Sequence, residues 1–399
     1  MQRRKYLLAL SAISGGCLSF QEEEAGTATP SSSTPEKSAP DAENSDIAVN
    51  TPTETESLFE KSNIDWSNET TFRRGYFNHG YFYAVGGDVI AMDPSTGFRE
   101  WRFRDNRPAA GINDESFSYT EDLVLAPSYV YENGSDETAI LYALNQSGEK
   151  VWEFDTVGKD ISPSPVHSSN HIILASDNFS TDGAQEGSVT VYCVDLAGNP
   201  VWDTTFDSEY ILNIAAFNNR VYISVPGDGV TVLDIETGDT IAGSLIDSEY
   251  VRFHQYENYL FLLSEEVFKY DLRSDTIIWR SGQIGRIDSI NTKVISEVSG
   301  QLLLIADGKI KSISRKNGDQ KWEYASGDSV KIQNSPLEVS DNYLWAVDEV
   351  ERIHAVKYNG EEEFVTKTFG TTPGIAGEDG KVIISDRSAD ETFKLDPNF

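Results

Sequence analysis

A short phrase recurs along most of the chain, and it constrains the fold more than any other feature. Each copy has an apolar run, a tight polar turn that usually ends in glycine, and an aromatic position four residues later. The copies span residues 89–101, 141–152, 191–202, 230–242, 267–279, 310–322 and 353–364, and an eighth begins at residue 392. Such self-similarity indicates small units that share one core.

The glycine and the tryptophan of the phrase keep a constant spacing. The glycines are Gly97, Gly148, Gly198, Gly238, Gly318 and Gly360, and the tryptophans are Trp101, Trp152, Trp202, Trp279 and Trp322. Ala242 replaces one tryptophan, Phe364 replaces another, and Asp275 replaces one glycine. Glycine allows the positive φ of a hairpin turn. A tryptophan on the outer strand can wedge against the next unit while its indole NH finds an acceptor, so we interpret both as structural residues.

Two further apolar runs precede each phrase, as in residues 164–176, 213–225 and 292–306. Four strands in roughly 37 to 51 residues are typical of a propeller blade, and no segment has a sustained helical period. We therefore predict an all-β fold, an eight-bladed β-propeller of four-stranded antiparallel blades over residues 62–399.

The eighth copy lacks an outer strand, and the segment around Trp66 resembles one. We expect residues 62–68 to complete the blade formed by residues 370–397, which would close a monomeric ring and remove an exposed strand edge. A seven-bladed ring with a stray tail is the alternative.

The pattern A-x-D-x-x-(T/S)-G-x-x-x-W, which spans residues 91–101, resembles the tryptophan-docking repeat of the PQQ-like propeller family. That family includes quinoprotein dehydrogenases and non-enzymatic members, among them a lipoprotein that assists assembly of outer-membrane barrels. The dehydrogenases share an adjacent Cys-Cys disulfide and a calcium site, whereas this chain has only Cys17 and Cys193. The resemblance alone does not choose between these members, but the missing Cys-Cys pair argues against a dehydrogenase. We therefore expect a protein that is not an enzyme, with no catalytic, cofactor-binding or metal-binding residues, and we expect Cys193 to be a small buried core residue.

The first 17 residues are typical of an export signal. Arg3 and Arg4 precede a short apolar stretch, and Cys17 follows three small residues. The segment resembles a lipobox with Cys17 as the lipidated residue, which predicts anchoring to the outer face of the cell membrane. The arginine pair resembles a twin-arginine signal, although the general secretory route stays open. Residues 18–61 are rich in Ser, Thr, Pro and Glu and predict a disordered linker.

Acidic residues dominate the composition. The chain has 65 Asp and Glu against 32 Lys and Arg, a formal net charge of -33. A field of this sign repels nucleic acid. The charge indicates a halophile's solvated surface, with an acidic docking face for a basic partner as the alternative.

Two insertions at matching places in consecutive units, residues 129–138 and 178–187, are the candidate interaction surface, because loops on a rigid scaffold commonly bind partners. Candidate glycosylation sequons begin at Asn68, Asn133, Asn145 and Asn178. The leading hypothesis is a protein-binding or scaffolding module with a protein or envelope partner. The alternatives are a quinone-dependent or other small-ligand enzyme and a solute-sensing receptor domain.

Overall fold

The computed structural model describes residues 64–108, 110–130, 138–177, 187–243, 245–246, 251–285, 287–290, 300–327, 330–339, 343–367, 374–378, 381–386 and 391–395. All of them belong to one compact unit, Thr55–Phe399. They form 34 strands and no helix, which confirms the all-β prediction. Accordingly, this part of the chain contains no helix with the length and apolar character needed to cross a membrane.

Six of the sheets contain four antiparallel strands each. The first three are β2 (Arg74–Asn78), β3 (Tyr81–Val85), β4 (Asp88–Met92) and β5 (Arg99–Arg104); β16 (Asn213–Phe217), β17 (Arg220–Val225), β18 (Gly229–Asp234) and β19 (Thr240–Ala242); and β20 (Arg252–Tyr256), β21 (Tyr259–Leu263), β22 (Val267–Asp271) and β23 (Thr276–Arg280). The next two are β24 (Ile287–Ile290), β25 (Gln301–Ala306), β26 (Lys309–Ser314) and β27 (Gln320–Tyr324); and β28 (Ile332–Val339), β29 (Tyr343–Asp348), β30 (Arg352–Lys357) and β31 (Glu362–Lys367). The last, called the closing sheet here, contains β32 (Gly374–Glu378), β33 (Lys381–Asp386), β34 (Glu391–Leu395) and β1 (Ile64–Asn68).

The seventh sheet has ten strands. One arm consists of β6 (Ala110–Ile112), β7 (Ser118–Tyr119), β8 (Val124–Val130), β9 (Ile140–Leu144) and β10 (Lys150–Asp155). The other consists of β12 (Val166–Ser168), β13 (His171–Asp177), β14 (Val189–Asp195) and β15 (Pro200–Phe206). Between them, β11 (Asp160–Ile161) pairs with β13 and with β8.

The prediction of eight separate four-stranded blades is therefore wrong. Hydrogen bonding divides the described strands into seven sheets, six of four strands and one of ten. The two arms are joined because Asp160 pairs with Asp177 on one side and with Tyr129 on the other. The repeated phrase marks the hairpins of each unit, but it carries no signal for a two-residue strand between them.

The first described strand and the last lie in the same sheet. β1 pairs with β34 in antiparallel register, with Trp66 opposite Lys394 and Asn68 opposite Thr392. The amide of Phe72 donates to Ser385 Oγ at 3.0 Å, and the Thr392 hydroxyl donates to the Thr70 carbonyl. Residues near the C-terminus are therefore part of a sheet and not a stray tail.

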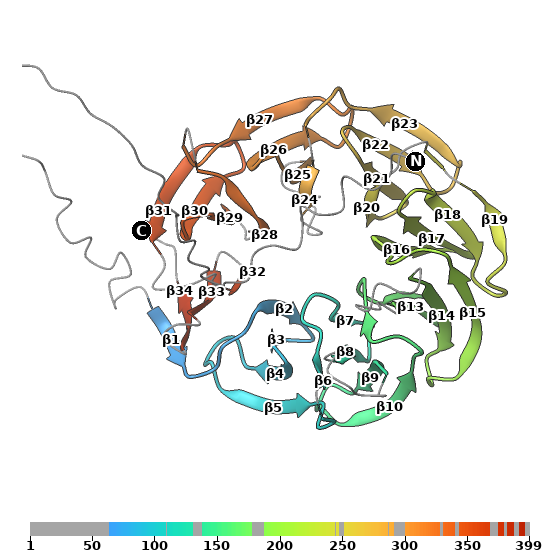
Figure 1. Ribbon diagram of the computed structural model, residues 1–399. Coiled ribbons are helices and arrows are strands. Elements are labelled where there is room, and N and C mark those ends of the chain that lie inside the picture. The colour runs from blue at the N-terminus through green and yellow to red at the C-terminus, as the bar shows by residue number, and fades with distance from the viewer. Residues whose placement is uncertain are drawn as a thin grey trace, which may run out of the picture. The chain divides into compact units, whose positions relative to one another are not determined.

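The sheets follow one another around a ring, with their first strands inside and their last strands outside (Figure 1). β32 contacts both β28 and β2, so the closing sheet bridges its two neighbours. Apolar clusters fill the spaces between neighbouring sheets. Phe82 packs with Ile383 on one side of the closing sheet, and Trp345 packs with Ile375 on the other. Middle strands such as β9 and β14 are buried along almost their whole length because both faces meet a neighbour.

The outer strands alternate between exposed and partly buried residues, as in β5 and β10. Each outer strand also contains a register shift immediately before the tryptophan position, which leaves one residue without a counterpart in the strand ladder. Such β-bulges protect a sheet edge from pairing with other chains. This extra residue is called the bulge residue below.

Candidate functional site

Five tryptophans join neighbouring sheets or the two arms of the ten-stranded sheet in the same way. Each indole covers the turn glycine of the next unit and donates its Nε1 proton to a carbonyl of that turn. The pairs and their N···O distances are Trp101 with Gly148 (Gln146 O, 2.8 Å), Trp152 with Gly198 (Leu196 O, 2.9 Å), Trp202 with Gly238 (Ile235 O, 2.7 Å), Trp279 with Gly318 (Arg315 O, 3.0 Å) and Trp322 with Gly360 (Tyr358 O, 2.8 Å).

This tryptophan contact is missing between the β16–β19 sheet and the β20–β23 sheet. Ala242 stands at the tryptophan position, and the next turn has Asp275 at φ 53° where the others have glycine. Here the Arg220 guanidinium forms an ion pair with Asp275 at 2.5 Å, and the Tyr270 hydroxyl donates to the same carboxylate at 3.0 Å. Between these two sheets both the tryptophan and the glycine are replaced, and polar contacts of Asp275 connect the sheets instead.

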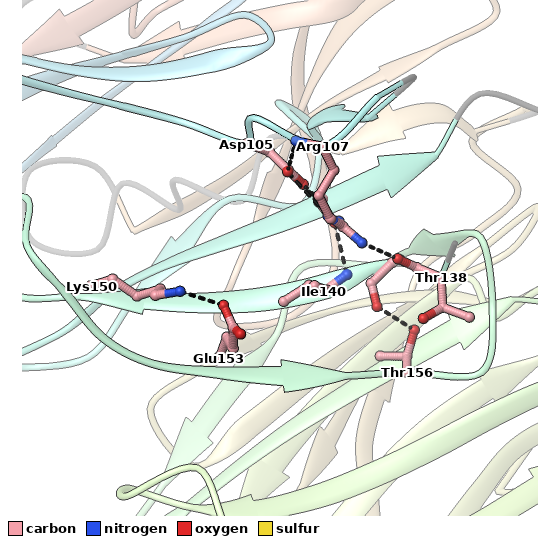
Figure 2. A network of polar contacts seen from close by, with 9 residues as sticks. Asp105, Arg107, Thr138, Ile140, Lys150, Glu153 and Thr156 are labelled. Atoms are coloured by element: carbon pink, nitrogen blue, oxygen red, sulfur yellow. Dashed lines mark hydrogen bonds and ion pairs between the residues drawn. The ribbon is translucent and has the colours of Figure 1, made fainter. Parts of the chain in front are cut away.

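The base of the first predicted interaction loop, residues 129–138, is held by a buried ion pair. Asp105 is 5% exposed and accepts from the Arg107 guanidinium at 2.6 Å. Arg107 also donates to Thr138 O at 2.6 Å, as Figure 2 shows. It donates to Ser128 Oγ at 2.8 Å as well, so one side chain contacts both ends of the loop. Burial raises the pKa of Asp105, but the hydrogen bonds from Arg107 outweigh it and hold that pKa below its usual value.

Hydroxyl groups connect this base to that of the second loop, residues 178–187. The Thr156 hydroxyl donates to Ala139 O and lies 2.9 Å from the Ser176 hydroxyl. Ser176 precedes Asp177, the last residue of β13. A Cβ atom on Gly158 would overlap Asp177 O and Ser176 Oγ, so only glycine fits at this close approach. The two predicted loops therefore start from bases that are hydrogen-bonded to each other.

Two carboxyl groups face each other across β11 and β13 at this junction. Asp160 lies opposite Asp177 and accepts from Asn113 Nδ2 at 2.7 Å. Burial and the neighbouring Asp160 raise the pKa of Asp177 to about 7. Burial also raises the pKa of Asp160, against the effect of the hydrogen bond from Asn113. The junction is thus sensitive to protonation near neutral pH.

Comparison with models of known protein families shows which family this chain belongs to. A family model described as outer membrane protein assembly factor BamB matches residues 136–398. The chain belongs to the BamB family. No curated protein matches the chain.

Solved structures share the fold of this BamB-family chain at low sequence identity. BamB from Moraxella catarrhalis is 13% identical with a TM-score of 0.57, and the match covers 83% of this chain and 99% of that one. The computationally designed Ika8 protein is 14% identical with a TM-score of 0.60 over 83% and 98%. Sqt1 of Saccharomyces cerevisiae is 11% identical with a TM-score of 0.58 over 84% and 98%.

Only some of the predicted site residues fall in the described part of this BamB-family chain. Arg3, Arg4, Cys17, Asn133 and Asn178 lie outside it, as do most residues of the two loops. Asn68 lies in β1. Asn145 lies in a hairpin turn, where its side chain accepts from the Ser147 and Glu149 amides. Cys193 is fully buried, and burial raises its pKa to about 12, which confirms its prediction as a core residue.

The sequence interpretation missed Asp105, Arg107, Asp160 and Asp177. None of them falls in the repeated phrase, and no ligand-like spacing marks them. Within the described residues, no group of three or more His, Cys, Asp or Glu side chains could hold a metal ion.

Proposed function

We propose that this protein is a non-enzymatic, protein-binding scaffold that meets its partner through the two loops of the ten-stranded sheet. The observation that carries this proposal is the hydrogen-bonded base of these loops, where Arg107 contacts both Ser128 and Thr138. A buried ion pair at that place gives the loops a rigid support, which lowers the entropic cost of binding. Membership of the BamB family supports a binding role.

A site-specific crosslink tests the proposal. Val157 is 62% exposed and adjoins Thr156 at the loop base, whereas Phe98 is 74% exposed in the β4–β5 turn at the opposite end of the hairpins. A photo-crosslinking residue at Val157 should capture one protein partner in stoichiometric amount in intact cells. The same residue at Phe98 serves as the control. Equal capture at both positions, or none at Val157, would contradict the proposal.

We also propose that residues 1–17 direct export and that Cys17 is lipidated, with residues 18–61 as a tether to the outer face of the membrane. The support is the small-residue run before Cys17 and the Arg3-Arg4 pair. Mass spectrometry of the mature protein should find a lipid-modified N-terminal Cys17, and Cys17→Ser should release the protein from the membrane fraction. Retention of the Cys17→Ser variant would exclude this anchor.

The last part of the proposal concerns the acidic composition and the glycosylation sequons. An excess of acidic residues suits high salt, where the Debye length falls to about 3 Å at 1 M, so we expect the protein to be most stable in molar salt. Glycosylation at Asn145 would have to break an existing hydrogen bond, because its amide nitrogen donates to Glu149 at 3.0 Å.

A further inference from the structure

Basic residues are concentrated in one part of this acidic chain. Residues 269–331 contain 11 of the 32 basic residues and only 8 of the 65 acidic ones, so the rest of the chain carries 21 basic and 57 acidic residues. The segment contains the end of β22, all of β23 and all four strands of the β24–β27 sheet. The segment therefore has a formal charge of +3, whereas the rest of the chain has a formal charge of -36.

Some of these basic side chains are neutralised by acidic neighbours and others are not. Lys309 and Lys311 pair with Glu323, and Arg280 pairs with Glu266. By contrast, Arg273, Lys316 and Lys321 are exposed and form no ion pair with any other described residue. The turns that carry Arg273 and Lys316 also carry Asp271 and Asp319, so the three cations exceed these two carboxylates by one charge.

Two exposed aliphatic side chains lie beside this charge. Ile277 and Ile278 on β23 are 46% and 47% exposed. The next residue, Trp279, donates to Arg315 O at 3.0 Å and covers Gly318. The turn that carries Lys316 therefore packs directly against β23, and the aliphatic and cationic residues form one surface, the β23–β27 rim.

The bulge residues differ in chemistry around the ring. They are acidic on β1, β5 and β31 (Asp65, Glu100 and Glu363) and aliphatic on β10, β15, β19 and β23 (Val151, Val201, Ile241 and Ile278). On β27 the bulge residue is the basic Lys321. Among the described sheets, an aliphatic bulge lies next to a basic one only at the β23–β27 rim.

We propose that the β23–β27 rim binds an acidic polypeptide segment with aliphatic side chains. The charge is complementary to Arg273, Lys316 and Lys321, and the aliphatic groups match Ile277 and Ile278. Because the bulges at Ile278 and Lys321 interrupt both strand edges, recognition occurs through side chains and not through addition of a strand. This surface is separate from the loop base and does not depend on the function proposed above.

The charge of the whole chain favours a short segment over an extended anionic surface. A membrane or a nucleic acid would also meet the repulsion of the surrounding acidic residues. A short peptide feels mainly the charges within a Debye length, which is about 10 Å at 0.1 M salt. We therefore expect the charge of the rim, and not that of the whole chain, to govern the binding of a short peptide.

The test uses the full chain and a fluorescein-labelled peptide with the repeated sequence EVELG, measured by fluorescence anisotropy. A peptide with lysine in place of each glutamate is the charge control. The EVELG peptide should bind saturably, and its affinity should fall between 0.1 M and 1 M salt as the charges are screened. The double variant Lys316→Glu/Lys321→Glu should weaken binding by about tenfold or more, and Ile278→Ser by about threefold.

Lys150→Glu reverses the charge of one lysine on β10, away from the rim, and should leave the affinity unchanged. Thermal unfolding of each variant checks that it is folded. Equal binding of both peptides, equal loss in the Lys150→Glu control, or absence of binding would overturn the proposal. Binding of phosphatidylglycerol vesicles by the rim without binding of the peptide would also overturn it.

Discussion

The indole of Trp152 lies against Gly198 of the next unit so closely that a Cβ atom on Gly198 would come within 2.7 Å of the indole Cδ2. The same indole donates to Leu196 O at 2.9 Å. Gly198 has φ 83°, a conformation that other residues adopt at a steric cost. One residue therefore meets two requirements, the turn and the close approach of the tryptophan.

Trp152→Ala should lower the free energy of unfolding by about 3 kcal/mol, because it leaves a cavity over the turn and an unpaired carbonyl. Gly198→Ala should cost about 1 to 3 kcal/mol through strain and overlap. The double variant should lose less than the sum, since both changes break one contact. Chemical denaturation measures all three, and the neighbouring Val151→Ala should change stability by less than about 0.5 kcal/mol. Additive losses would contradict a shared contact.

The missing tryptophan contact between the β16–β19 and β20–β23 sheets is a second test of this pairing. Ala242→Trp combined with Asp275→Gly should raise the unfolding temperature, because it supplies both halves of the contact seen at the other turns. Ala242→Trp alone should not, since Asp275 keeps its side chain where the indole would lie. Differential scanning calorimetry distinguishes the variants. A gain from the single variant equal to that of the pair would show that the glycine is not required.

Arg107→Ala should destabilise the loop base strongly, by about 3 to 5 kcal/mol, because it leaves the Asp105 carboxylate buried without its partner. Limited proteolysis should then cut faster between residues 130 and 138. Lys150→Ala breaks an exposed ion pair with Glu153 in the same region (Figure 2) and should cost less than about 1 kcal/mol. Comparable effects of the two substitutions would argue against a special role for Arg107.

Protonation of Asp177, which lies opposite Asp160, should affect the stability of the protein near neutral pH. Burial and the neighbouring Asp160 raise the pKa of Asp177 from its ordinary value of 3.8 to about 7 in the folded state. A carboxyl group whose pKa is higher in the folded state stabilises that state while the group is neutral. Its contribution to the free energy of unfolding is therefore largest below about pH 4 and declines as the pH rises toward 7. Asp177→Asn should remove this decline, whereas Asp203→Asn on exposed β15 should not. Urea unfolding from pH 4 to pH 8 measures the difference, and parallel curves for wild type and Asp177→Asn would contradict it.

Several features of the fold were predictable from local chemistry. The turn glycines and the tryptophans at plus four indicated the hairpins, because both residue types have strong local requirements. The resemblance of the Trp66 segment to an outer strand predicted its pairing with the last unit, and β1 does pair with β34. The number of sheets was not predictable, since β11 has two residues and its partners, Tyr129 and Asp177, lie far from it along the chain.

By itself, the sequence determined that this chain is an all-β repeat protein, because the spacing of glycine and tryptophan is a local property of each hairpin. Only the tertiary structure decided which charges are buried and which surfaces are joined. Arg107 supports a loop because folding brings Ser128 and Thr138 to its guanidinium. The turn that carries Lys316 meets β23 because Trp279 packs on it. Burial and proximity of this kind depend on packing between sheets, which no local pattern encodes.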